Sequence, residues 1–288
     1  MSKRALKHFG VTEADLLGAG VQSRAYGLGA DGVLRVFSPA TPLAHVQALD
    51  GFYRRLDTRA VGFQVPRFDE VLQLGSVACV VEARIPGIEL TRFLDTAPPE
   101  ARKQALANYM AAAGEIQAIG YEAAFYGQIL GDTPVRSDSW PTYLSRRVRA
   151  SLAEAPWALA DLTAPAAVLA LFDSLALARI AAPRRLAHGD YHPGNVLVDE
   201  VGAVTGVIDF SVQAVMGDPL LDLTSAAFFF DDKANRAFAA GQAEGVEGFD
   251  EATRLYWLYY SFFYLSTKAA KPALYDLCVR SLNGAVAA

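Results

Sequence analysis

Cysteine is scarce in this chain. Only two of its 288 residues are cysteines, Cys79 and Cys278, and they lie far apart in the sequence. The chain has no Cys-x-x-Cys pair and no cluster of cysteine with histidine, which argues against a disulfide scaffold and against a thiolate zinc site. We therefore expect a reduced, cytoplasmic protein.

Long hydrophobic runs are also missing. The longest charge-free stretch is Val36–Leu49, with 14 residues, and two prolines interrupt it. The most apolar stretch is Leu255–Thr267, with 13 residues, whereas a membrane helix needs about 20. The N-terminus has basic residues but no apolar stretch behind them, so the sequence predicts neither a secretory signal nor a membrane partner.

Positive charge is not in excess. Lysine and arginine number 26 against 31 aspartates and glutamates, which gives a net charge of −5. Dedicated nucleic-acid binders are usually basic, so we expect no nucleic-acid partner. The 52% hydrophobic content excludes wholesale disorder, and the length suits one large domain or two lobes.

The predicted elements change character near Pro86-Gly87. Before this point the pattern favours strands and one helix; after it, helices dominate. The early part predicts a hairpin over 15–30, strands over 32–37, 65–74 and 76–85, and a helix over 43–56. The later part predicts helices over 98–119, 143–155, 165–181, 219–230, 251–270 and from 272 onward. We therefore expect an α+β protein with a small strand-rich lobe followed by a larger helical lobe.

The most informative stretch is Leu186–Asp199, which contains Asp190 and, five residues later, Asn195. A second apolar strand ends at Asp209, so a hairpin would deliver this carboxylate to the same place. Phosphoryl transfer needs a group that orients the attacking hydroxyl and metal ions that neutralise the phosphates. Amide and carboxylate oxygens of this kind suit Mg²⁺.

These segments resemble the catalytic and metal segments of the aminoglycoside phosphotransferase family, which shares the bilobal architecture of protein kinases. The resemblance implies a nucleotide-binding lobe over residues 1–86, with a small antiparallel sheet and one helix. It implies a mostly helical lobe over residues 87–288. Asp190 would be the catalytic base, and Asn195 and Asp209 would bind Mg²⁺. The implied reaction moves the γ-phosphate of ATP or GTP to a hydroxyl of a small molecule.

The resemblance also implies where the nucleotide binds. Gly18, Gly20 and Ser23 would form a loop over the phosphates, and Arg35 would take the place of the strand lysine. Backbone groups of the link that begins with Glu82-Ala83-Arg84 would bind the base.

One feature departs from the family pattern, and another distinguishes the chain from protein kinases. The helix over 43–56 contains no glutamate to pair with Arg35, and Asp50 is its nearest acid. This departure leaves an inactive, nucleotide-binding pseudokinase as an alternative. Only seven residues, Ser211–Gly217, separate the metal segment from Asp218 and the helix predicted over 219–230, which leaves no room for a long activation loop and argues against a protein substrate.

Three further residues are expected to support the site. His188 would be a scaffold residue beside Asp209, and Asp222 would brace the catalytic loop through hydrogen bonds. His188, Asp190 and His192 alternate, so a zinc hydrolase is a competing hypothesis in which these three residues bind the metal.

The acceptor is not defined by the sequence. An aminoglycoside would need carboxylates, and the candidates are Asp231, Asp232, Glu244, Glu247, Asp250 and Glu251. The aromatic helix over 255–265 offers a surface for an apolar or sugar-ring substrate. Aminoglycosides, sugars and amino-alcohols all remain open.

Overall fold

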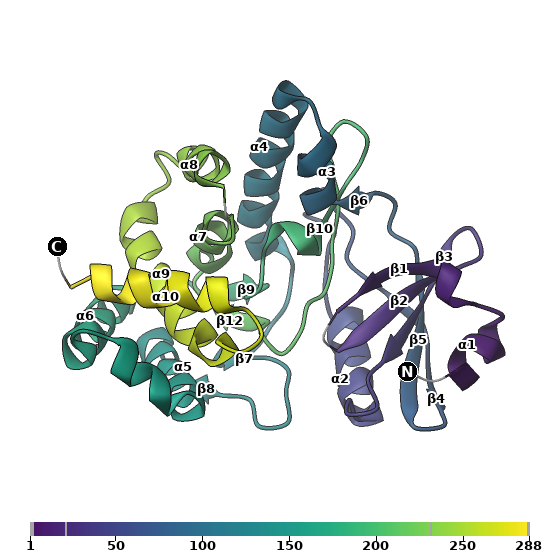
Figure 1. Ribbon diagram of the computed structural model, residues 1–288, viewed down its shortest axis with the longest axis horizontal. Helices are drawn as coiled ribbons and strands as arrows, with labels where there is room; N and C mark the ends of the chain where they lie inside the picture. The colour runs from purple at the N-terminus through teal and green to yellow at the C-terminus, as the bar shows by residue number, and fades with distance from the viewer. Residues whose placement is uncertain (1–2, 21, 231, 287–288) are drawn as a thin grey trace.

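A five-stranded antiparallel sheet forms one end of the molecule, and helices gather at the other end (Figure 1). The computed structural model describes residues 3–20, 22–230 and 232–286. The sheet has the order β1-β2-β3-β5-β4. Its strands are β1 (Leu16–Ala19), β2 (Ser23–Leu28), β3 (Gly32–Phe37), β4 (Phe68–Leu74) and β5 (Val77–Ala83). β5 is almost wholly buried and apolar, as the middle of a covered sheet requires.

Two helices accompany this sheet. The short helix α1 (Lys3–Phe9) lies at the outer end of the molecule, and α2 (Leu43–Arg54) lies between the sheet and the helical region (Figure 1). The apolar residues of α2 recur at steps of three and four, so one face of the helix is buried. Phe52 and Tyr53 on that face contact Phe210 at ring distances of 5.7 and 6.3 Å.

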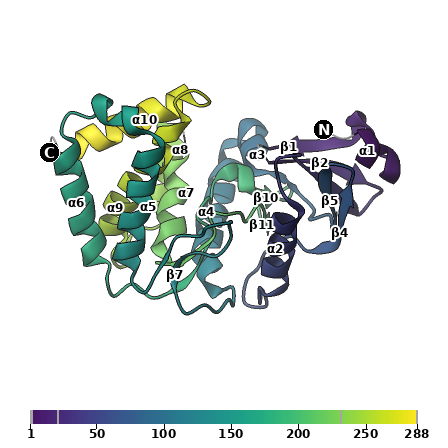
Figure 2. The same ribbon diagram turned by 90° about the horizontal axis from the view of Figure 1, so that it is seen from below.

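The helical region is built around α9 (Phe249–Phe263), which packs against α5, α6, α7 and α10 (Figure 2). The other helices of this region are α3 (Leu90–Thr96), α4 (Pro99–Glu115), α5 (Trp140–Glu154), α6 (Pro165–Ala178), α7 (Leu220–Phe228), α8 (Lys233–Gly241) and α10 (Pro272–Gly284). Short 3₁₀ turns occur at Glu13–Asp15, Ile116–Ala118, Pro156–Asp161, Pro193–Asn195 and Tyr264–Thr267. Among the described residues, no helix is long and apolar enough to cross a membrane.

Two smaller antiparallel sheets complete the fold. One has the order β11-β10-β6 and the other β8-β7-β12-β9. Their strands are β6 (Ile88–Glu89), β7 (Tyr126–Gln128), β8 (Arg136–Ser137), β9 (Arg185–Ala187), β10 (Val196–Val198), β11 (Val204–Val207) and β12 (Val215–Gly217). The loop between β9 and β10 carries His188, Asp190 and Asn195, and Asp209 follows β11. These strands therefore fix how far apart the predicted site residues lie.

The buried core contains side chains from both sides of residue 86, the predicted boundary between the lobes. One cluster of buried side chains joins Phe52 and Phe68 from the sheet region with Leu106, Tyr109 and Phe210 from the helical region. The expected mixed architecture, strand-rich first and helical afterwards, is confirmed. The division into lobes of residues 1–86 and 87–288 stays a prediction.

The two cysteines are buried and unpaired. Cys79 lies on β5 and Cys278 lies on α10. Burial raises the pKa of the Cys79 thiol to about 11 and that of the Cys278 thiol to about 12.

Candidate active site

The loop between β9 and β10 carries three of the predicted residues, His188, Asp190 and Asn195. The backbone turns at Gly189, where φ is +75°, a conformation that L side chains rarely adopt. A Cβ atom at this position would also collide with the carbonyl oxygen of Gln213. Glycine is therefore required for the loop to take this course.

Asp222, in the first turn of α7, holds the loop in place. Its Oδ2 accepts a hydrogen bond from the His188 N–H at 2.6 Å, and its Oδ1 accepts one from the Gly189 N–H at 2.9 Å. Burial raises the pKa of Asp222 to about 7, although these two N–H donors act in the opposite direction. The contacts agree with the bracing role expected from the sequence.

Asp190 has a side-chain donor on each carboxylate oxygen. The Tyr264 hydroxyl donates to Oδ1 at 2.9 Å, and the Gln213 amide donates to Oδ2 at 3.3 Å. Sequence reasoning missed both donors. Tyr264 sits in an aromatic run whose members look alike in sequence, and only the packed structure distinguishes it.

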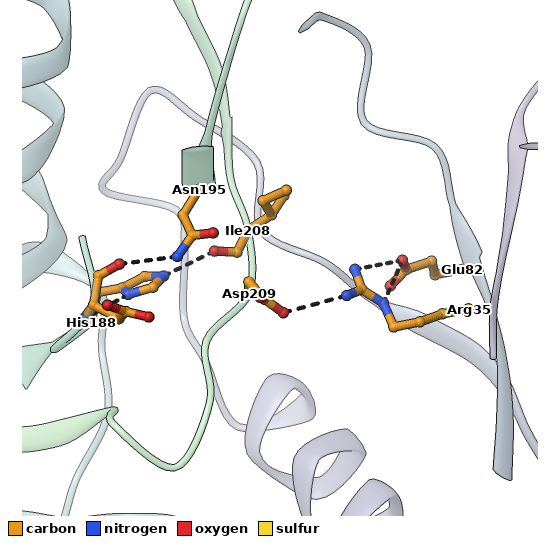
Figure 3. A network of polar contacts seen from close by, with 7 residues as sticks. Arg35, Glu82, His188, Asn195, Ile208 and Asp209 are labelled. Carbon is orange, nitrogen blue, oxygen red and sulfur yellow. Dashed lines mark hydrogen bonds and ion pairs between the residues drawn. The ribbon is translucent and has the colours of Figure 1, made fainter. Parts of the chain in front are cut away.

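Asn195 and Asp209 supply oxygen atoms near one another in the site (Figure 3). The amide nitrogen of Asn195 donates to the backbone oxygen of Asp190 at 3.0 Å, which leaves its amide oxygen to act as a ligand. Asp209 has φ of 66° and is the one non-glycine residue with positive φ among the residues described. Its side chain is 58% exposed, so the carboxylate is open to a cation. This donor set fits Mg²⁺.

His188 is buried beneath these groups. Its Nδ1 accepts a hydrogen bond from the Asp190 N–H at 3.3 Å, so the ring proton lies on Nε2 and points at the Ile208 carbonyl oxygen, 2.9 Å away (Figure 3). Burial lowers the pKa of His188, and the hydrogen bond to Ile208 opposes this effect. The histidine is therefore a neutral scaffold residue.

The geometry does not support the zinc hypothesis. Both ring nitrogens of His188 already have partners, and Nδ1 of His192 accepts a hydrogen bond from the Gly194 N–H at 3.1 Å. In the part of the chain that the structure describes, no group of three or more histidine, cysteine or acidic side chains could hold a metal ion.

Arg35, on β3, lies between two acids (Figure 3). Its Nε and Nη2 donate to Oε1 of Glu82 at 3.2 and 3.0 Å, and its Nη1 donates to Oδ1 of Asp209 at 3.3 Å. Burial alone would lower the pKa of Arg35, but the charges of Glu82 and Asp209 raise it overall. The guanidinium therefore stays charged inside the protein.

Two expectations about this region are wrong. Asp50 does not reach Arg35; it pairs with Arg54 one helical turn away, at 2.9 Å. The backbone N–H of Arg84 donates to the Asp31 carbonyl oxygen at 2.8 Å, and the binding of a base by the other backbone groups of this link stays a prediction. Glu82 was expected to act only through its backbone, whereas its side chain pairs with Arg35.

The glycine loop joins β1 to β2. The Gly20 N–H donates to the Ser23 carbonyl oxygen at 2.9 Å, which closes the turn, and both residues line the cavity described next. Gly18 lies on β1 and does not line that cavity. Val21 lies outside the described residues.

A cavity of about 660 Å³ brings these groups together. Arg35, Asp190 and Asp209 line it, while Asn195 is buried and does not line it. On the side away from the sheet its walls include Phe229, Phe230, Asp232, Tyr264 and Lys271. A nucleotide phosphate chain and a small acceptor could therefore meet at Asp190.

Few of the predicted acceptor carboxylates lie in this cavity. Asp232 lines it, and Asp95 on α3 adds an acid that the sequence did not suggest. Asp231 lies outside the described residues. The remaining predicted acids do not line the cavity; they are Glu244, Glu247, Asp250 and Glu251.

Comparison with known proteins adds to this geometry. The model of the phosphotransferase enzyme family matches residues 13–257. The fold is similar to the GDP and kanamycin complex of APH(2")-IIia, with 15% identity, a TM-score of 0.63, and coverage of 99% of this chain and 97% of that chain. No curated protein gives a significant sequence match.

Two further aminoglycoside phosphotransferases have similar structures. APH(2'')-Ib bound to ADP is 14% identical, with a TM-score of 0.61 and coverage of 97% of this chain and 95% of that chain. APH(3'')-Id from Streptomyces rimosus, in complex with ADP and streptomycin, is 16% identical, with a TM-score of 0.58 and coverage of 97% and 96%. At these identities the likeness establishes the fold.

Proposed function

Since this chain belongs to the phosphotransferase enzyme family, we propose that it moves the γ-phosphoryl group of ATP or GTP to a hydroxyl of a small molecule, with Mg²⁺ as cofactor. The observation that carries the proposal is the arrangement of Asp190, Asp209 and Arg35 around one cavity. A cytoplasmic location accompanies the proposal, because both thiols are unpaired.

Asp190 acts as the base in this proposal. As the new O–P bond forms, the acceptor hydroxyl gives its proton to a carboxylate oxygen of Asp190, and the nucleoside diphosphate leaves. Tyr264 and Gln213 hold the carboxylate in one orientation through their hydrogen bonds. Asn195 ties the backbone of Asp190 to the start of β10.

Mg²⁺ would be held by the amide oxygen of Asn195 and the carboxylate of Asp209. When bound, the ion neutralises charge on the nucleotide phosphates. Asp209 also accepts a hydrogen bond from Arg35, so a positive side chain already lies where the phosphates would enter. Gly20 and Ser23 lie across the cavity from the catalytic loop and would cover the phosphates.

The acceptor pocket favours a molecule with a ring or apolar body and few positive charges. Phe229 and Tyr264 form an aromatic wall with ring centroids 5.6 Å apart, against which a sugar ring can pack. Asp95 and Asp232 can each take an ammonium group, while Lys271 would repel a polycation. We therefore propose a sugar or amino-alcohol acceptor. Kanamycin, gentamicin and streptomycin are bound in solved relatives, so aminoglycosides belong in any test.

The pseudokinase alternative loses the observation that motivated it. It rested on a helix without a glutamate to pair with Arg35. Glu82 supplies the missing acid from β5. An active phosphotransferase is therefore the better explanation of the site.

The test is Mg²⁺-dependent release of ADP and GDP in the presence of hydroxylated compounds, with Asp190→Asn as the blank. The panel spans sugars, amino-alcohols and aminoglycosides. We expect one class to stimulate release by the wild type and the variant to be about 10²–10⁴-fold slower while still binding nucleotide. Equal rates for the two proteins would overturn the assignment of Asp190 as the base.

A further inference from the structure

The acid that pairs with Arg35 lies on a strand, not on a helix. Glu82 is on β5, two residues from Val80, the residue opposite Arg35 in the β3–β5 pairing. Side chains two apart on a strand point to the same face, so Glu82 and Arg35 face each other across neighbouring strands. The helix α2 contributes no acid here, because Asp50 is its only one and pairs with Arg54.

Burial makes this pair interdependent. Glu82 is 5% exposed, and the side chain of Arg35 is 14% exposed. A buried carboxylate is costly unless a positive group compensates it. Oε1 of Glu82 accepts two hydrogen bonds from Arg35, while its Oε2 finds no partner among the residues that the structure describes. Arg35 is thus the group that compensates the charge of Glu82.

The remaining edge of the guanidinium points into the site. Glu82 takes Nε and Nη2, so Nη1 is directed toward Asp209 (Figure 3). Asp209 is a weaker anchor, because it lies on a connecting segment, is mostly exposed and makes a single contact of 3.3 Å. The position of the guanidinium is therefore set by the strand carboxylate.

We propose that Glu82 is a positioning residue that fixes the Arg35 guanidinium on the sheet and presents its free edge to the nucleotide phosphates. The proposal rests on the proposed function of the cavity. It follows that the phosphate-binding cation is held by two hydrogen-bonded strands and does not depend on the placement of α2. Protein kinases differ, because there the partner glutamate lies on a helix that moves.

The first test compares Glu82→Gln with Asp50→Asn. Glutamine keeps the shape and one acceptor oxygen but removes the charge, and the Asp50 variant removes the only acid of α2. Affinity for ADP and GDP with Mg²⁺ is measured by calorimetry, and kcat and KM are measured with each nucleotide. We expect Glu82→Gln to weaken nucleotide binding about ten-fold and to lower kcat, with the KM of the acceptor unchanged. Asp50→Asn should stay within two-fold of the wild type.

The second test is a double-mutant cycle with Arg35→Ala. If Glu82 acts through Arg35, adding Glu82→Gln to Arg35→Ala costs no further nucleotide affinity. The double variant should also unfold at a higher denaturant concentration than Arg35→Ala alone, because the uncompensated buried charge is gone. Independent, additive losses would overturn the positioning role.

The outcomes separate this role from the proposed function. Wild-type protein that binds neither ADP nor GDP would overturn the proposed function, and the positioning role with it. Wild-type protein that binds nucleotide while Glu82→Gln binds it equally well would overturn the positioning role alone.

Discussion

At the scale of single residues, the catalytic carboxylate is defined by its two donors. Tyr264 and Gln213 come from segments about fifty residues apart and approach different oxygens of Asp190. Burial raises the pKa of Tyr264, and the neighbouring charge of Asp190 adds to this effect. The phenol therefore stays protonated and remains a hydrogen-bond donor at neutral pH.

Removing the Tyr264 hydroxyl should disturb catalysis without disturbing nucleotide binding. In Tyr264→Phe the ring still packs against Phe229, but Asp190 loses one donor. A hydrogen bond to a charged group is worth about 1.5–3 kcal/mol, so we expect kcat to fall by about ten-fold or more. Tyr259→Phe is the matched control, since its hydroxyl contacts Tyr143 and not Asp190. Similar kcat values for the two variants would contradict the role of Tyr264.

The residues that sequence could identify are those fixed by local spacing. Asp190 and Asn195 stand five apart on one loop, and Asp209 closes the hairpin that follows, so their proximity is encoded within a short segment. Glu82 and Tyr264 meet their partners across the fold. Nothing in the local sequence of either residue indicates its partner, because tertiary packing decides which side chains meet.

At the scale of elements, the catalytic loop requires its glycine, Gly189, whereas the helix α2 does not require its own glycine, Gly51. Gly189 has a positive φ, and a side chain there would collide with the backbone of Gln213. Gly51 lies within α2, where no atom stands within 4 Å of an added Cβ. The same substitution should therefore have opposite effects at the two positions.

We expect Gly189→Ala to destabilise the protein and abolish activity, because the loop cannot keep both its φ and its packing. Gly51→Ala should instead stabilise the protein by about 0.5–1 kcal/mol, because alanine is the better helix former. Urea denaturation of the two variants measures both effects. A Gly189→Ala protein as stable and active as the wild type would show that the loop adopts another conformation.

The elements that sequence predicted well are the long ones. Helices such as α4 and α6 are rich in alanine, a strong helix former, and prolines mark their first turns. The sequence does not predict the short helices α1, α3 and α8, because seven to nine residues make only about two turns and offer few positions from which to recognise a helix. α8 follows Asp232, which the sequence suggested only as a candidate acceptor acid and which caps the helix by accepting from the Asn235 N–H at 2.7 Å.

At the scale of the whole molecule, buried ionisable groups make stability depend on pH. Burial raises the pKa of Asp222 to about 7, above the unfolded value of 3.8. The folded chain therefore keeps a proton on Asp222 that the unfolded chain releases between about pH 4 and pH 7. This contribution to stability is complete below pH 4 and is lost as the pH rises through 7. Burial lowers the pKa values of His188 and His192, so these residues act in the opposite direction.

Asp222→Asn should isolate the contribution of Asp222. Asparagine cannot ionise, so its free energy of unfolding relative to the wild type should rise between about pH 4 and pH 7 and then level off. Each unit of pKa difference corresponds to about 1.4 kcal/mol. Urea denaturation of both proteins across this pH range measures the difference, in which the histidine contributions cancel. A difference that does not vary with pH would contradict the raised pKa.

The burial of both thiols has a practical consequence. A thiol reacts as its thiolate, and with pKa values of about 11 and 12 only on the order of one Cys79 side chain in ten thousand is ionised at pH 7, and fewer at Cys278. Maleimide reagents should therefore leave the native chain unlabelled. One cysteine introduced on α1 and one on α6, near opposite ends of the molecule (Figure 2), would accept a pair of fluorophores in an otherwise wild-type protein. The efficiency of energy transfer then reports whether the distance between α1 and α6, on opposite sides of the cavity, changes as nucleotide binds.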